Sequence, residues 1–134
     1  MKNSKFGPLK TKKEHALQWV FETLVDRTDF IQKRMFGCLA GYLGDRIVLV
    51  LADKESPWNG VLVPTERSYH EAICGQFPTL VPHPVLGKWL YLDQGQEDFE
   101  KTVEGILRLI QQTDTRIGVI PKPKKRRNRK LQKV

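Results

Sequence analysis

The stretch that decides the fold is QKRMFGCLAGYLGDRIVLVLADK, residues 32–54. Within it, residues 46–52 place six apolar side chains after one arginine. Such a run is too short for an amphipathic helix and is typical of a central strand. The pair Gly44-Asp45 precedes the run and is a two-residue turn signal with glycine first. We therefore predict a β-hairpin in which residues 35–43 pair with residues 46–52.

Apolar residues at helical spacing predict a helix on each side of this hairpin, over residues 13–28 and from residue 98 to about 113. A shorter helix is expected over residues 66–75, with Thr65 as its N-cap. The two long helices have buried stripes made of Leu17, Val20, Phe21, Leu24 and Val25 in the first, and Phe99, Val103, Ile106, Leu107 and Ile110 in the last.

Two further strands are predicted from short apolar runs over residues 60–63 and 88–92. The element order is then α-β-β-β-α-β-α. This order indicates an α+β fold, in which an antiparallel sheet of about four strands carries its helices on one face. Residues 116–120 are expected to pack back on this body. The predicted core includes Phe21, Leu24, Leu49, Val61, Ile106 and Ile110.

A chain of 134 residues is the usual length of one domain. We expect that domain over residues 13–120, with a flexible basic leader over residues 1–12 and a disordered basic tail over residues 121–134. No apolar stretch approaches the ~20 residues that span a bilayer, and the first residues lack the apolar block of a signal peptide. A cytoplasmic protein without a membrane partner is therefore expected.

The cysteines and histidines do not form a metal-ligand pattern. Cys38 and Cys74 lie far apart without a second cysteine or a histidine at zinc-ligand spacing, so neither a metal nor a cofactor is expected. Both cysteines are interpreted as small core residues. His70 and Cys74 are four residues apart on one predicted helix, and a thiol or metal site there is the alternative.

The net charge of +8 is concentrated at the end of the chain. The basic residues there are Lys122, Lys124, Lys125, Arg126, Arg127, Arg129, Lys130 and Lys133, without an acidic residue among them. The other 15 Lys and Arg residues equal the 15 Asp and Glu residues in number, so the rest of the chain is neutral. Such a tail predicts weak, sequence-independent binding to nucleic acid or to an acidic protein surface. The alternative is a solvated tail that aids solubility.

Three further residues are candidates for contact with a ligand or partner. His83 is held rigidly between Pro82 and Pro84, and Trp89 and Arg34 are large side chains able to recognise a ligand. No catalytic constellation accompanies them. We therefore favour a non-enzymatic binding or regulatory module, and the alternative is a small-ligand binder or enzyme with a cleft near these residues.

The hairpin also carries a family resemblance. Arg34, Met35, Phe36, Gly37, Gly41 and Tyr42 match the Arg-Met-Phe-Gly pattern and the following glycine and aromatic of the TfoX N-terminal domain (TfoX/Sxy) family, with Cys38 in place of a second glycine. The resemblance spans about residues 13–115, and YjbR-like proteins are a weaker second likeness. It implies a regulatory module, since the longer family members are associated with natural competence in bacteria. We expect the motif to begin a strand, with Phe36 or Met35 inward and Arg34 outward.

Overall fold

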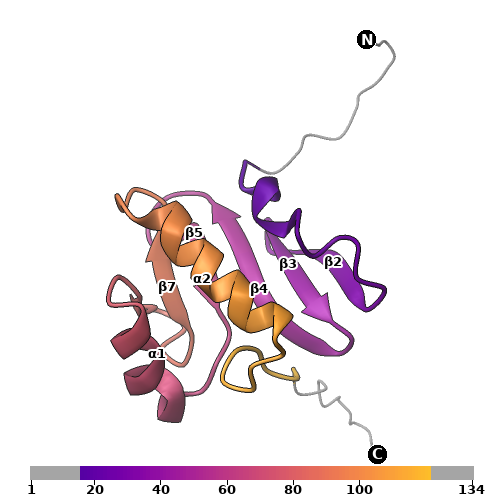
Figure 1. Cartoon of the computed structure of the whole chain (residues 1–134). Coiled ribbons are helices and arrows are strands. Elements are labelled where there is room, and N and C mark those ends of the chain that lie inside the picture. Colours follow the sequence, from indigo (N-terminus) through magenta and orange to yellow (C-terminus); the bar gives the residue numbers. More distant parts are fainter. Residues whose placement is uncertain (1–15, 122–134) are drawn as a thin grey trace, which may run out of the picture.

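A computed structural model describes residues 16–121 of the protein (Figure 1). The predicted leader over residues 1–12 and the eight cations of the tail lie outside the described residues. The described part is α+β: a six-stranded antiparallel sheet in the order β2-β3-β4-β5-β7-β6, with two α-helices. The strands are β2 (Phe30–Met35), β3 (Cys38–Leu43), β4 (Arg46–Asp53), β5 (Asn59–Val63), β6 (Val81–Pro82) and β7 (Leu90–Asp93).

The helices are α1 (His70–Gln76) and α2 (Phe99–Gln111), and two short 3-10 turns are η1 (Gln18–Phe21) and η2 (Arg67–Tyr69). Figure 1 shows α2 running diagonally across one face of the sheet. The predicted stripe of α2 is confirmed, because all five of its residues are buried. The six core residues predicted from the sequence are also confirmed, each with at most 2% of its surface exposed.

The central hairpin is confirmed as β3 and β4. Gly44 has φ 61°, so the turn between these strands needs its glycine. Opposite Gly41 and Tyr42, β4 contributes one extra residue, Val48, and this bulge shifts the register. Because of it, Val48 and Leu49 both point to the α2 side of the sheet. The apolar run is uninterrupted because both faces of β4 are buried, and the bulge places two consecutive residues of it on the α2 side.

The predicted first helix is wrong in type. Residues 17–24 form 3-10 turns, in which the Val20 and Leu24 amides donate to the Leu17 and Phe21 carbonyls at 2.9 Å. Val25, expected in the buried stripe, is 51% exposed. The branched and aromatic residues of this segment are poor helix formers, and the chain must turn at residue 28 to enter β2.

The predicted strand count is too low because it omits β2 and β6. The β2 strand lies at the edge of the sheet and is only half-buried, so its apolar alternation is weak. The β6 strand has two residues.

The predicted N-cap at Thr65 is wrong as well: its hydroxyl donates to the Arg116 carbonyl at 2.5 Å, and its side chain is buried. This bond ties the end of β5 to the segment after α2.

The expected return of residues 116–120 to the body is confirmed. Ile117 is buried in the main core. Val119 and Ile47 exchange both backbone hydrogen bonds, with N···O distances of 2.9 and 3.1 Å. The chain therefore reaches Pro121 alongside the start of β4.

Candidate functional site

The face of the sheet opposite α2 carries a second apolar cluster. Its buried members are Cys38, Ala40, Ile47, Val50, Ala52, Leu62 and Tyr91, all from strands. Among residues 16–121, the buried apolar side chains of η1, α1 and α2 all pack in the main core, on the α2 side of the sheet. We call this second surface the open face. Antiparallel sheets commonly turn a polar face to solvent, so an apolar one needs an explanation.

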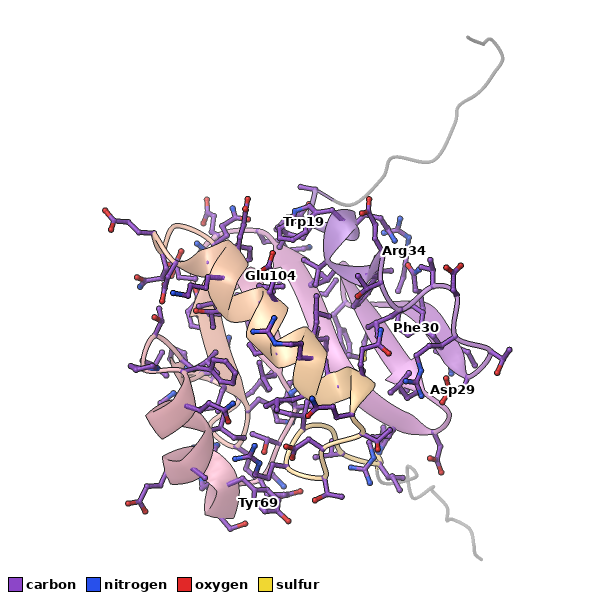
Figure 2. All side chains as sticks on the ribbon, viewed as in Figure 1. Trp19, Asp29, Phe30, Arg34, Tyr69 and Glu104 are labelled. Carbon is purple, nitrogen blue, oxygen red and sulfur yellow. The ribbon has the colours of Figure 1, made fainter. Side chains whose placement is uncertain are left out.

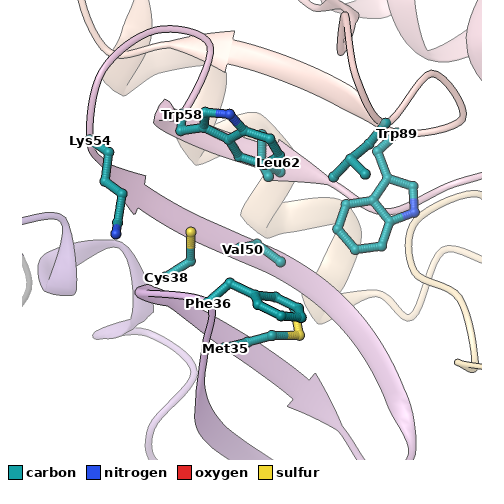
Figure 3. Close-up of a pocket in the computed structure, with 9 residues that line it drawn as sticks. Met35, Phe36, Cys38, Val50, Lys54, Trp58, Leu62 and Trp89 are labelled. Carbon is teal, nitrogen blue, oxygen red and sulfur yellow. The ribbon is translucent and has the colours of Figure 1, made fainter.

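A groove of about 470 Å³ lies on the open face (Figure 3). Its floor consists of Cys38, Val50 and Leu62, one residue from each of three adjacent strands. Its sides are formed by Met35, Phe36, Lys54, Trp58, Leu86 and Trp89. The volume lies within the range of small-ligand pockets, which are mostly apolar with a few polar groups. Lys54 is the single charged residue among the described residues that line it.

Phe36 projects from the turn between β2 and β3. Phe36 and Gly37 both have positive φ, 54° and 80°, in a two-residue loop closed by the Met35–Cys38 pair. This is the pattern of a type I′ turn, which favours Asn-Gly. Phenylalanine is rarely found at positive φ, and its side chain here is 92% exposed. An exposed aromatic kept in an unfavourable conformation indicates a functional surface.

The expectation that the Met-Phe-Gly motif begins a strand is wrong, whereas the inward position expected for Phe36 or Met35 holds for Met35. The motif ends β2 and forms the turn, Phe36 points to solvent, and Met35 packs at the border of the open face. Gly37 is favoured by its φ of 80°, because the only atoms of residues 16–121 that an added Cβ would meet belong to the end of the flexible Lys54 side chain, which can move. A Phe-Gly pair between two apolar runs was the available sequence signal for this turn.

His83 positions the two tryptophans rather than lining the groove. Its ring is 1% exposed and lies 4.4 Å, centroid to centroid, from the Trp58 ring. Nε2 donates to the Pro57 carbonyl at 2.9 Å, and Nδ1 accepts from the Val85 and Leu86 amides at 3.1 and 3.0 Å. The three bonds assign a neutral ring with its proton on Nε2. His83 thus joins the loop before β5 to the loop before β7.

The structure brings together two of the three predicted ligand residues. Trp89 forms a side of the groove, and His83 is buried behind Trp58. Arg34 lies near the end of β2 (Figure 2) and, by alternation from Met35, faces the α2 side. Arg34 and Trp89 therefore do not share a cleft. The sequence reasoning missed Met35, Phe36 and Trp58, because the groove forms only when four separate segments meet.

The groove contains a thiol but no arrangement that would activate it. Burial raises the pKa of the Cys38 thiol, which disfavours the nucleophilic thiolate. The suggested pairing of His70 with Cys74 is not formed: His70 Nε2 donates to the Lys88 carbonyl at 2.7 Å, and Cys74 Sγ donates to the Leu80 carbonyl at 3.4 Å. Within residues 16–121 no group of three His, Cys, Asp or Glu side chains could hold a metal ion.

Replacing Phe36 with asparagine is expected to stabilise the protein by about 1 kcal/mol, because asparagine tolerates positive φ at the first position of a type I′ turn. Chemical denaturation of both proteins measures the difference. Gly37→Ala is the matched control and should destabilise, since an alanine at φ 80° is strained. A loss of stability in Phe36→Asn would mean that the exposed ring contributes more packing than the backbone strain costs.

Comparison with family models, curated proteins and solved structures gave no match for this chain. Among the helices of residues 16–121, none has the length and apolarity required to cross a bilayer.

Proposed function

We propose that the protein is a non-enzymatic binding module that contacts nucleic acid weakly and without sequence preference through its basic tail. The location of the charge carries this proposal. Eight cations and no acidic residue lie between Lys122 and Lys133, whereas the rest of the chain is neutral. Lysine and arginine side chains that neutralise phosphates release condensed counterions, which gives affinity without base recognition. The resemblance to the TfoX N-terminal domain is compatible with a cytoplasmic regulatory module of this kind.

The place where the tail leaves the body supports the same proposal. Val119 packs against the open face, and Ile120 and Pro121 border a shallow hollow with Lys33 and Tyr42. Ile120 is 57% exposed. The first tail cation thus follows directly on a solvent-exposed segment at the rim of the open face, where a phosphate backbone has access.

A chain stopped at Pro121 tests this function against the full chain. Each phosphate neutralised on a duplex contributes about 0.9 to the slope of log affinity against log salt. If five or six tail cations engage at once, the full chain should show a slope of roughly −5, and the shortened chain should lose nearly all affinity for duplex DNA. Fluorescence anisotropy with labelled duplexes of two unrelated sequences at two salt concentrations measures both quantities.

Three results would contradict the proposal. Unchanged affinity after truncation would place the phosphate contacts on the body. No binding by the full chain at low salt would remove nucleic acid as the partner. A strong difference between the two duplex sequences would also contradict it, since phosphate contacts carry no sequence information.

The second candidate function is a small-ligand binder that uses the groove beside Trp89. The groove's volume and apolar lining favour it. An enzyme is less well supported, because no acidic residue or histidine lines the groove in the described part of the chain.

A further inference from the structure

We infer that the open face is a stacking surface for single-stranded nucleic acid, with the rings of Phe36, Trp58 and Trp89 receiving unpaired bases. The inference rests on the proposed function and extends it from the tail to the body. It assigns an occupant to an apolar surface that the described helices leave uncovered.

The aromatic side chains have the chemistry that such a partner needs. Phe36 comes from the β2–β3 turn, whereas Trp58 and Trp89 come from the loops before β5 and β7, and all three line one groove. Stacking of a base on an aromatic ring tolerates any base and typically changes affinity about tenfold. The basic tail contains no aromatic residue, so a protein that uses it for phosphates must find stacking surfaces on its body.

The rings are presented firmly rather than on free loops. The buried His83 ring lies against Trp58, and the His83 amide donates to the Trp89 carbonyl at 2.9 Å. Phe36 is held by the hydrogen-bonded turn between β2 and β3. The Trp58 ring, packed against His83, therefore loses little conformational entropy when a base stacks on it, whereas the turn fixes only the backbone of the exposed Phe36.

Strand β4 runs from the segment before Pro121 to the groove. The tail begins two residues after Val119, which pairs with Ile47 near the start of β4, and β4 leads to Lys54 in the groove. Eight residues of strand span about 25 Å. Lys33 lies near the first end, with its Nζ 5.2 Å from the centre of the Tyr42 ring, and Lys54 lies at the other. Cations at both ends suit a phosphate backbone that crosses the face.

The geometry favours a single strand over the other macromolecular partners. A duplex keeps its base planes inside the stack, so it can engage the tail but not the rings. An apolar peptide could fill the groove, but it would not use the eight cations of the sequence after Pro121. Nucleic acid is the partner that uses both features.

The test compares a twelve-nucleotide poly-dT strand with a duplex of equal length, using the full chain and its variants. Trp89→Leu and Phe36→Asn should each weaken single-strand binding about tenfold. They should leave duplex affinity and the salt slope unchanged. Trp19→Leu is the control, because Trp19 is a half-exposed ring that contacts Phe99 on the opposite face. If Trp89→Leu does not fold, Phe36→Asn still tests the inference, because it relieves backbone strain and should fold.

Intrinsic fluorescence supplies a direct signal. The chain has three tryptophans, and in a Trp19→Phe background the remaining emission comes from Trp58 and Trp89. Stacked thymines should quench that emission, whereas the duplex should not. The inference would also be contradicted if poly-dT quenched this emission but Trp89→Leu and Phe36→Asn bound poly-dT with unchanged affinity. The rings would then lie near the strand without contributing to binding.

Each outcome separates this inference from the proposed function. Groove variants that bind poly-dT like the unaltered chain, while truncation at Pro121 abolishes binding, would overturn the inference and leave the tail's role intact. A truncated chain that still binds poly-dT but has lost its duplex affinity would support both the inference and the tail's role. A truncated chain that keeps its duplex affinity, while the groove variants lose poly-dT, would contradict the tail's role and leave the inference intact. Binding of the apolar dye 8-anilinonaphthalene-1-sulfonate that poly-dT does not displace would assign the groove to another occupant and overturn the inference.

Discussion

Gly60→Ala is expected to destabilise the protein by about 3 kcal/mol, because the sheet has no space for an added methyl group at this position. Gly60 lies in β5 between β4 and β7, where it pairs with Ala52 and Asp93. A Cβ at this position would lie 2.0 Å from the Leu92 carbonyl oxygen and 2.9 Å from the Gln94 amide nitrogen. Both atoms belong to the backbone, so the strands themselves would have to separate.

Urea denaturation of Gly60→Ala beside Gly75→Ala measures this effect. Gly75 is exposed in α1, and a Cβ added there would meet no atom within 4 Å. Alanine should therefore raise stability at that position by up to about 1 kcal/mol, because it has the higher helix propensity. If Gly60→Ala cost less than half a kcal/mol, β5 and β7 could not lie as close together as their pairing requires.

Leu49→Ala and Ile106→Ala should each cost ~2–5 kcal/mol, the range for removing a buried aliphatic side chain and leaving a cavity. Leu49 is fully buried in β4 and Ile106 is fully buried in α2, and both belong to the cluster between the sheet and that helix. The free energy of unfolding from urea titrations measures both losses. The exposed Val25 is the control site, and Val25→Ala should change stability by less than about 0.5 kcal/mol. Losses under half a kcal/mol at both core sites would refute the assignment of this core.

The sequence predicts the elements whose signal is local. The run that forms β4, the turn at Gly44 and the buried stripe of α2 each depend on the spacing of a few neighbouring residues. The edge strand β2 escapes prediction because none of its residues is fully buried, so its apolar alternation is weak. The segment containing Phe21 resembles a helix in its pattern because 3-10 turns can bury the same residues as one helical stripe.

The candidate site is harder to predict, because it depends on contacts between distant segments. The size of Trp89 and the prolines that flank His83 are visible in the sequence. Neither pattern reveals that His83 is buried against Trp58. The position of Phe36 depends on whether Met-Phe-Gly begins a strand or turns between two, and the short pattern alone does not distinguish them.

The two edge strands of the sheet, β2 and β6, have features that oppose aggregation. An apolar sheet surface with unprotected edges can recruit further strands and grow into a fibril. Here one outermost strand, β2, carries Lys33 and Arg34, and the other, β6, has only two residues, one of them Pro82. Charge, proline and short length all oppose the addition of another strand. The edge strands on both sides of the apolar groove therefore oppose the addition of strands from other copies of the chain.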